Sequence, residues 1–124
     1  MTLGKIKEIL DAEVLVGNEY MDIDVRDAFA ADLLSDVLAF AKEGTLLITG
    51  ITNPQVIRTA EMLEFIGILF VRGKKPDEEA VNLARIKKVP LLSTRYIMFE
   101  TCGRLFKNGL VGCIERTVNE GTET

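Results

Sequence analysis

Three short apolar runs recur at nearly constant spacing in the second half of the chain. They occupy residues 46–50, 68–73 and 91–94, and their first residues are 22 and 23 positions apart. Each run is continuous and aliphatic, which is typical of a strand that is covered on both faces. A segment with apolar residues at helical spacing follows each run. Strand, turn and helix, repeated three times, predict a right-handed parallel βα array.

The starts of these three helices carry recognisable signals. Asn53 and Pro54 supply an N-cap followed by proline at the first helical position. The acids of residues 77–79 suit a first helical turn, where they offset the helix dipole. Ser93 and Thr94 offer cap hydroxyls to the third helix. These signals support the three predicted strand-to-helix turns.

The first half of the chain is less regular. We predict an amphipathic helix over residues 3–10 and a strand over 13–17, which ends at a glycine. Residues 24–30 form either another strand or an extended edge. Residues 32–41 carry a clear amphipathic pattern and predict a helix. Near the end, residues 110–116 are either a last strand or an apolar segment docked onto a partner.

Length and composition place all of this in one domain. The 124 residues are 48% hydrophobic and 27% charged, an ordinary globular balance. We therefore predict a single α/β domain over residues 1–124, a mainly parallel sheet of βα units flanked by helices. Residues 110–124 are expected to dock onto a partner or to fray, with fraying expected at 119–124.

The chain is expected to be cytoplasmic. It contains no apolar run of the length that spans a bilayer, and its first residues lack the apolar core of a signal peptide. Its two cysteines, Cys102 and Cys113, are too few for a disulfide scaffold. We expect both thiols to be small buried residues, Cys102 on the apolar face of the last helix.

Charge is distributed unevenly along the sequence. The net charge is −4, but residues 1–66 carry −7 and residues 67–124 carry +3. An acidic chain without a dense basic tract does not predict nucleic-acid binding. The asymmetry favours an anionic ligand near the second half, a head-to-tail pairing of subunits, or only solvated faces.

The sequence favours binding over catalysis. It has no histidine, which removes the imidazole bases and the usual histidine-containing zinc sites. Residues 67–75 lack the spacing and the hydroxyl of a P-loop, and no dinucleotide-binding glycine motif is present. Asp32 and Asp36, one helical turn apart, either share a face that binds a cation or form a solvated helix start. We predict no enzyme activity, no catalytic residue, no metal site and no cofactor.

The candidate binding site follows from the predicted sheet. Ligands of open parallel sheets bind at the carboxyl ends of the strands, where helices begin. Here those ends contain hydroxyls, glycines and basic side chains within residues 49–53, 72–75 and 93–96. Free backbone N–H groups, hydroxyls and cations suit a phosphate or carboxylate; the alternative is that these residues only cap helices and end strands. The predicted ligand-binding residues are Thr49, Gly50, Thr52, Asn53, Gly73, Ser93, Thr94 and Tyr96.

The arrangement of these segments resembles the DRTGG domain family over residues 3–108. The most specific stretches are Val89-Pro-Leu-Leu-Ser-Thr94 and the following Tyr96-x-x-Phe99-x-x-x-Gly103-Arg-Leu105. The family is similar in fold to the N-terminal domain of HPr kinase/phosphorylase, and it accompanies CBS domains in regulated pyrophosphatases. At the expected position of the loop that names the family, Asp-Arg-Thr-Gly-Gly, this chain has residues 50–54, Gly-Ile-Thr-Asn-Pro.

The resemblance implies a regulatory, dimer-forming module near adenine-nucleotide ligands, with catalysis in other domains. Our first hypothesis is a stand-alone module that senses a nucleotide or other phosphorylated small molecule and acts on a partner protein. The second is a non-catalytic dimerisation or interaction subunit without a ligand. An open crevice at the strand ends favours the first hypothesis, and an exposed apolar surface favours the second. Neither predicts contact with nucleic acid or membrane.

Overall fold

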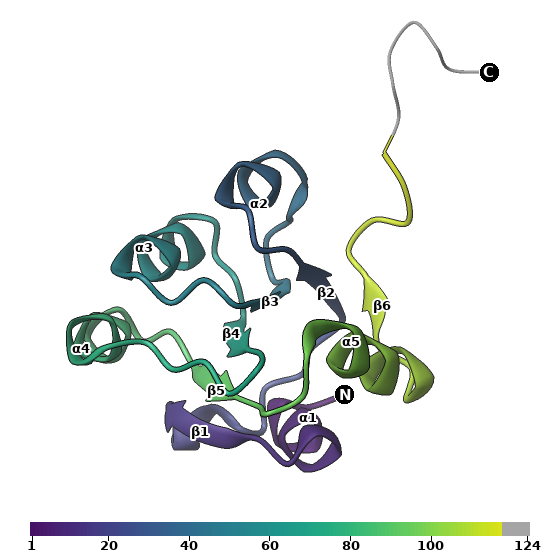
Figure 1. Cartoon of the computed structure of the whole chain (residues 1–124), viewed down its shortest axis with the longest axis horizontal. Coiled ribbons are helices and arrows are strands. Elements are labelled where there is room, and N and C mark those ends of the chain that lie inside the picture. Colours follow the sequence, from purple (N-terminus) through teal and green to yellow (C-terminus); the bar gives the residue numbers. More distant parts are fainter. Residues whose placement is uncertain (118–124) are drawn as a thin grey trace, which may run out of the picture.

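The computed structural model describes residues 1–117, so the predicted frayed tail at 119–124 lies outside the described part. Helices and strands alternate along the chain (Figure 1). In order, they are α1 (Leu3–Leu10), β1 (Glu13–Val16), a short 3-10 helix η1 (Asn18–Tyr20), β2 (Asp27–Ala30), α2 (Leu34–Phe40), β3 (Leu46–Thr49), α3 (Pro54–Met62), β4 (Gly67–Phe70), α4 (Glu78–Lys87), β5 (Leu91–Ser93), α5 (Met98–Lys107) and β6 (Val111–Gly112).

The six strands form one mixed sheet in the order β1-β5-β4-β3-β2-β6. The pairs β2–β3, β3–β4 and β4–β5 are parallel, and β6 pairs parallel to β2. Strand β1 runs antiparallel to β5 at the other edge. The mainly parallel α/β fold is thus confirmed, as are the three βα units of the second half.

Helices cover both faces of the sheet (Figure 1). Helices α2, α3 and α4 lie on one face because each right-handed crossover adds its next strand on the same side of the previous one. Helix α5 has to return from β5 to β6 at the far end of the sheet, and it lies on the opposite face beside α1. The sheet is therefore the middle of three layers.

The core explains why the central strands have continuous apolar sequences. Every residue of β3 and β4 is buried. Alternate residues face opposite helical layers: Leu47 and Ile68 pack in the cluster with α3, whereas Leu46 and Leu69 pack in the cluster with α1. A strand sandwiched in this way has no polar face to alternate with an apolar one.

Several local predictions are confirmed at the element ends. Asn53 caps α3, its side-chain oxygen accepting the Val56 N–H at 3.3 Å. Residues 24–30 contain strand β2, and residues 110–116 contain the two-residue strand β6. Cys113, which follows β6, is half-buried and not fully buried as predicted. No helix within residues 1–117 is both long and apolar enough to cross a membrane.

Candidate functional site

The carboxyl ends of the parallel strands meet along one side of the sheet, which we call the carboxyl edge. Strand β1 runs the other way, so its first residue, Glu13, opposes Ser93 at the end of β5 and lies on the same side. An open groove of about 790 Å³ occupies this position, and we call it the strand-end groove. It is lined by Asp11, Glu13, Arg72, Gly73, Lys75, Ser93 and Arg95.

The loop after β4 forms the centre of the strand-end groove. Its tight turn is closed by the Lys74 N–H, which donates to the Val71 carbonyl at 3.0 Å. Arg72 and Gly73, the two central residues, have φ values of 61° and 68°, the left-handed pattern of a type I′ turn. Their N–H groups donate to the carbonyls of Tyr96 and Thr94, both at 2.8 Å. The turn is therefore fastened to the β5–α5 loop, and its backbone donors are already used.

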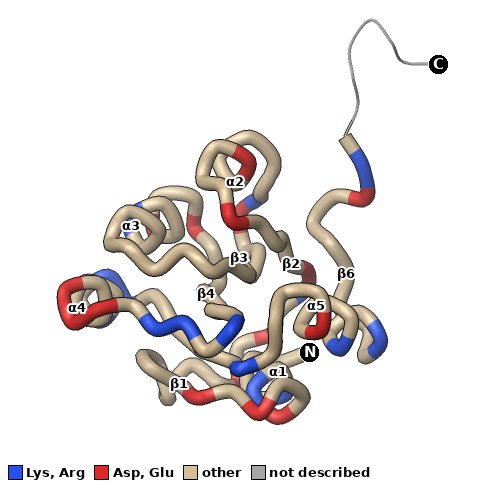
Figure 2. Tube along the Cα trace, viewed as in Figure 1, with Lys and Arg blue, Asp and Glu red and all other residues tan. Residues whose placement is uncertain are grey.

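Basic side chains give the groove its charge. The Lys and Arg positions of the β4–α4 loop form a nearly continuous stretch between α4 and α5 (Figure 2). Lys75 forms an ion pair with Glu13 at 2.8 Å, and both side chains are about half exposed. Such a pair contributes at most about 1 kcal/mol of stability in water. Arg72 and Arg95 are exposed, and neither has an ion-pair partner among residues 1–117.

The loop after β3 is held by a carboxylate. Asp32 accepts the Gly50 N–H at 2.6 Å and the hydroxyl of the fully buried Thr49 at 3.4 Å. Asp32 precedes α2, whose N-cap is Leu33, so of the two alternatives for Asp32 and Asp36 the shared helix face is wrong. The reason is that the Asp32 carboxylate accepts hydrogen bonds at the end of the neighbouring strand β3, away from α2.

The hydroxyls after β5 also serve the fold. Ser93 donates to the Lys74 carbonyl at 2.7 Å, and the buried Thr94 donates to the Leu10 carbonyl at 2.8 Å. The predicted cap role of both residues is therefore wrong. Helix α5 begins at Met98 with Ile97 as its N-cap, because the intervening loop first runs across the β4 turn.

The eight predicted ligand-binding residues separate into four groups. Gly73 and Ser93 line the groove. Thr49 and Thr94 are buried and bonded internally, and Gly50, Thr52 and Asn53 form the neighbouring β3–α3 loop. Tyr96 packs on the α5 side, with the Arg104 guanidinium 4.1 Å from the centre of its ring.

The groove also contains residues that the predicted set omitted. Arg72, Lys75 and Arg95 belong to the loops that the sequence pointed to, and their charge was the signal for including them. Asp11 and Glu13 come from α1 and the antiparallel strand β1. No sequence signal gave the direction of β1, so these two acids could not be assigned to the carboxyl edge.

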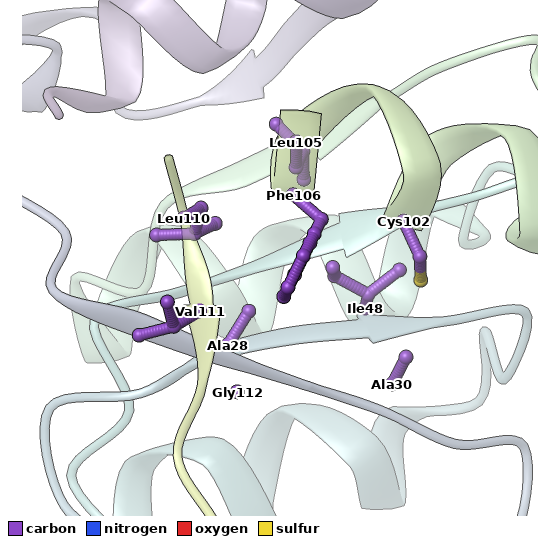
Figure 3. Close-up of a pocket in the computed structure, with 9 residues that line it drawn as sticks. All are labelled: Ala28, Ala30, Ile48, Cys102, Leu105, Phe106, Leu110, Val111 and Gly112. Atoms are coloured by element: carbon purple, nitrogen blue, oxygen red, sulfur yellow. The ribbon is translucent and has the colours of Figure 1, made fainter. Parts of the chain in front are cut away.

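A second hollow lies on the α1 and α5 face of the sheet. It is an apolar pocket of about 170 Å³ between α5, β6 and the sheet, where Cys102 and Phe106 point from α5 toward Ile48 (Figure 3). Cys102 is half-buried against the core, and this burial raises the pKa of its thiol. The thiol therefore stays protonated at neutral pH. Within residues 1–117, no three His, Cys, Asp or Glu side chains are grouped to hold a metal ion.

Comparison with known proteins places this geometry in a family. No curated protein matches the chain. One similar solved structure contains the CBS and DRTGG domains of the regulatory region of Clostridium perfringens pyrophosphatase, complexed with its activator diadenosine tetraphosphate. The TM-score is 0.67 at 18% identity, and the match covers 84% of this chain and 45% of that one. This likeness establishes a common fold, and the present chain spans less than half of the length of that structure.

The family model of the DRTGG domain matches residues 5–107, from α1 to the end of α5. The match includes the whole of the central sheet from β1 to β5 and every loop that forms the strand-end groove. The protein therefore belongs to the DRTGG domain family.

Proposed function

We propose that this DRTGG domain is a regulatory module that binds a phosphorylated small molecule, such as a nucleotide, in the strand-end groove. The observation that carries the proposal is a pair of exposed arginines, Arg72 and Arg95, which both line one groove and have no ion-pair partner among residues 1–117. Guanidinium groups match the oxygen geometry of phosphate and can bind it with two parallel hydrogen bonds.

The other side chains of the groove narrow the ligand class. Asp11 and Glu13 would repel a ligand that is anionic throughout, but carboxylates accept hydrogen bonds from hydroxyl and amino groups. A nucleotide carries both kinds of group, with phosphates for the arginines and ribose or base donors for the acids. The groove volume of about 790 Å³ also lies within the range of small-molecule sites.

The proposed regulatory role draws on the family. In the C. perfringens structure, the DRTGG domain is part of the regulatory region of an enzyme and the complex contains a nucleotide activator. By analogy, we infer that the present domain changes the activity of a partner protein when its ligand binds. The proposal assigns it binding and no catalysis, because the one hydroxyl among the groove's lining residues, that of Ser93, donates to the Lys74 carbonyl and not to a base.

Calorimetry tests this proposal directly. Purified protein is titrated with diadenosine tetraphosphate, ATP and pyrophosphate, with adenosine as the uncharged reference. We expect saturable binding of at least one phosphorylated compound, weakening as salt increases. Arg95→Gln should lower that affinity about tenfold through loss of a charge-assisted hydrogen bond. The control Lys42→Gln removes one exposed charge from the loop before β3, at the opposite side of the sheet, and should bind as wild type.

Two outcomes would contradict the proposal. Either the wild-type protein binds none of the three phosphorylated compounds, or Arg95→Gln binds them as tightly as the wild-type protein and the Lys42→Gln control do. A thermal-shift measurement on each variant establishes that the mutated domain is folded before its affinity is compared.

One observation favours the alternative function, a non-catalytic dimerisation or interaction subunit. Helix α5 exposes Phe99 to 84% and Phe106 to 70%, and Ile97 at its start is also exposed. Large aromatic side chains gathered on one exposed surface commonly mark a protein interface. A homodimer is one assembly that this surface supports, and its oligomeric state in solution is the test.

A further inference from the structure

We propose that Arg72 is the specificity-determining residue of the strand-end groove, which distinguishes a phosphorylated ligand from its unphosphorylated counterpart. We further infer that Gly50 lacks a side chain in order to leave space for the Arg72 guanidinium. Both statements rest on the proposed function of the groove. Two observations support them: the left-handed backbone of Arg72 in the β4 turn, and the contacts that a Cβ on Gly50 would make.

The backbone of Arg72 is unusual. Four non-glycine residues among 1–117 have left-handed φ, and three of them, Asp11, Glu64 and Lys88, lie at or just after the end of a helix. That conformation is common at helix ends. Arg72, with φ of 61°, instead occupies the first central position of the β4 turn.

An arginine gives no advantage to the turn itself. Left-handed φ is strained for residues with a long side chain, whereas Gly and Asn adopt it readily. The hydrogen bonds of the turn come from the backbone N–H groups of Arg72, Gly73 and Lys74, which any of several residues would supply. Asn would therefore suit the turn at this position but would lack the guanidinium. Residues with a strained backbone of this kind are often found at binding sites.

Gly50 provides the second observation. Its φ does not lie in the left-handed region, so its backbone would accept alanine. A Cβ at this position would lie 2.5 Å from Nη2 of Arg72 and 3.2 Å from Oδ1 of Asp32. The Arg72 guanidinium therefore occupies the space where a side chain of residue 50 would begin.

These contacts fix where the guanidinium lies. It extends from the β4 turn across the end of β3 and lies against the Gly50 backbone. Asp32, which accepts the Gly50 N–H, forms no ion pair with Arg72 in the described part of the chain. Arg72 also lines the groove, so it joins the ends of β3 and β4 at the site. A guanidinium that lies against Gly50 can offer its N–H donors to a phosphate at the strand ends.

Three variants test the inference by calorimetry with the tightest phosphorylated compound of the panel. Arg72→Asn removes the cation but retains a residue that tolerates left-handed φ, and it should weaken binding by at least tenfold without lowering stability. Arg72→Lys keeps the charge but loses the planar fork, and it should weaken binding by a smaller factor. Gly50→Ala displaces the flexible end of Arg72 and should weaken binding several-fold in an otherwise stable protein.

Lys42→Gln, in the loop before β3 at the opposite side of the sheet, is again the control and should bind as wild type. If Arg72→Asn binds as wild type while Arg95→Gln loses affinity, the specificity role of Arg72 is refuted and the proposed function stands. Unchanged binding by Gly50→Ala refutes the role given to Gly50. Failure of the wild-type protein to bind any phosphorylated compound overturns the proposed function and the inference together.

Discussion

At the scale of single residues, the hydroxyl of Thr94 connects two parts of the chain that are far apart in sequence. It donates to the Leu10 carbonyl at 2.8 Å, and the residue is 1% exposed. Thr94→Val keeps the side-chain volume but leaves this carbonyl without its donor. We expect the free energy of unfolding to fall by about 1–3 kcal/mol, the cost of leaving a buried polar group without a partner. Urea denaturation measures this change.

The half-buried Thr52 provides the comparison for Thr94. Thr52→Val, in the β3–α3 loop, should change the free energy of unfolding by no more than about 0.5 kcal/mol. Thr94→Ser keeps a hydroxyl and should recover part of the stability that Thr94→Val loses. If Thr94→Val and Thr52→Val lower the free energy of unfolding by the same amount, the Thr94 hydrogen bond makes no particular contribution to stability.

At the scale of elements, helix α4 shows how a local signal defines a helix start. The Asp77 carboxylate accepts the Ala80 N–H at 2.9 Å, and two acids follow in the first turn. Asp77→Ala should lower the free energy of unfolding by about 1 kcal/mol, the usual effect of removing an N-cap. Asp77→Asn retains an acceptor and should lose less. If both variants lose the same amount, charge and not the hydrogen bond makes the contribution of Asp77.

The predicted elements agree best with the structure where packing and sequence impose the same pattern. Strands β3, β4 and β5 were found because buried parallel strands need continuous apolar runs. The direction of β1 was not predictable from its four residues, because an antiparallel and a parallel edge strand have the same apolar pattern. Strand β6, with two residues, is too short for any periodicity, and its pairing with β2 depends on the path of α5.

The same limit applies to the candidate site. The sequence correctly indicated that loops with Arg72, Gly73 and Ser93 follow buried strands. It could not show that Arg72 adopts left-handed φ, since an Arg-Gly pair fits several turn types. Nor could it show that the Thr94 hydroxyl points to α1, because that bond joins residues 84 positions apart. Which hydroxyls face solvent depends on tertiary packing and not on the local sequence.

At the scale of the whole molecule, the outer surface of α5 is not covered by any other described part of the chain and exposes two aromatic side chains. Phe99, Gly103 and Phe106 recur at helical spacing on α5, and we call this surface the α5 face. Both aromatic rings are largely exposed, and a Cβ on Gly103 would meet no atom within 4 Å. Glycine inside a helix costs about 1 kcal/mol relative to alanine. Packing within the described part of the chain does not require a glycine at position 103. Close approach of a helix from another molecule would explain why a glycine is present.

The charges beside the α5 face make a second copy of the chain a suitable partner. Glu100 lies three residues before Gly103, and Lys107 lies four residues after it. If two α5 helices cross antiparallel at Gly103, Glu100 of each copy lies near Lys107 of the other, and Phe99 lies near Phe106. A two-fold interface requires this self-complementarity, because the same surface serves both subunits.

Substitution of Gly103 separates this dimer from the stability of the monomer. Gly103→Gln introduces a better helix former at an exposed position, so the monomer should be as stable as wild type or up to about 1 kcal/mol more stable. The same side chain would prevent close approach of a second α5, so the variant should sediment as a monomer at concentrations where wild type is dimeric. Analytical ultracentrifugation measures the mass, and Lys42→Gln is the control. A monomeric wild type, or a dimeric Gly103→Gln, would contradict the proposed interface, because a helix crossing at residue 103 cannot accommodate a glutamine on both copies.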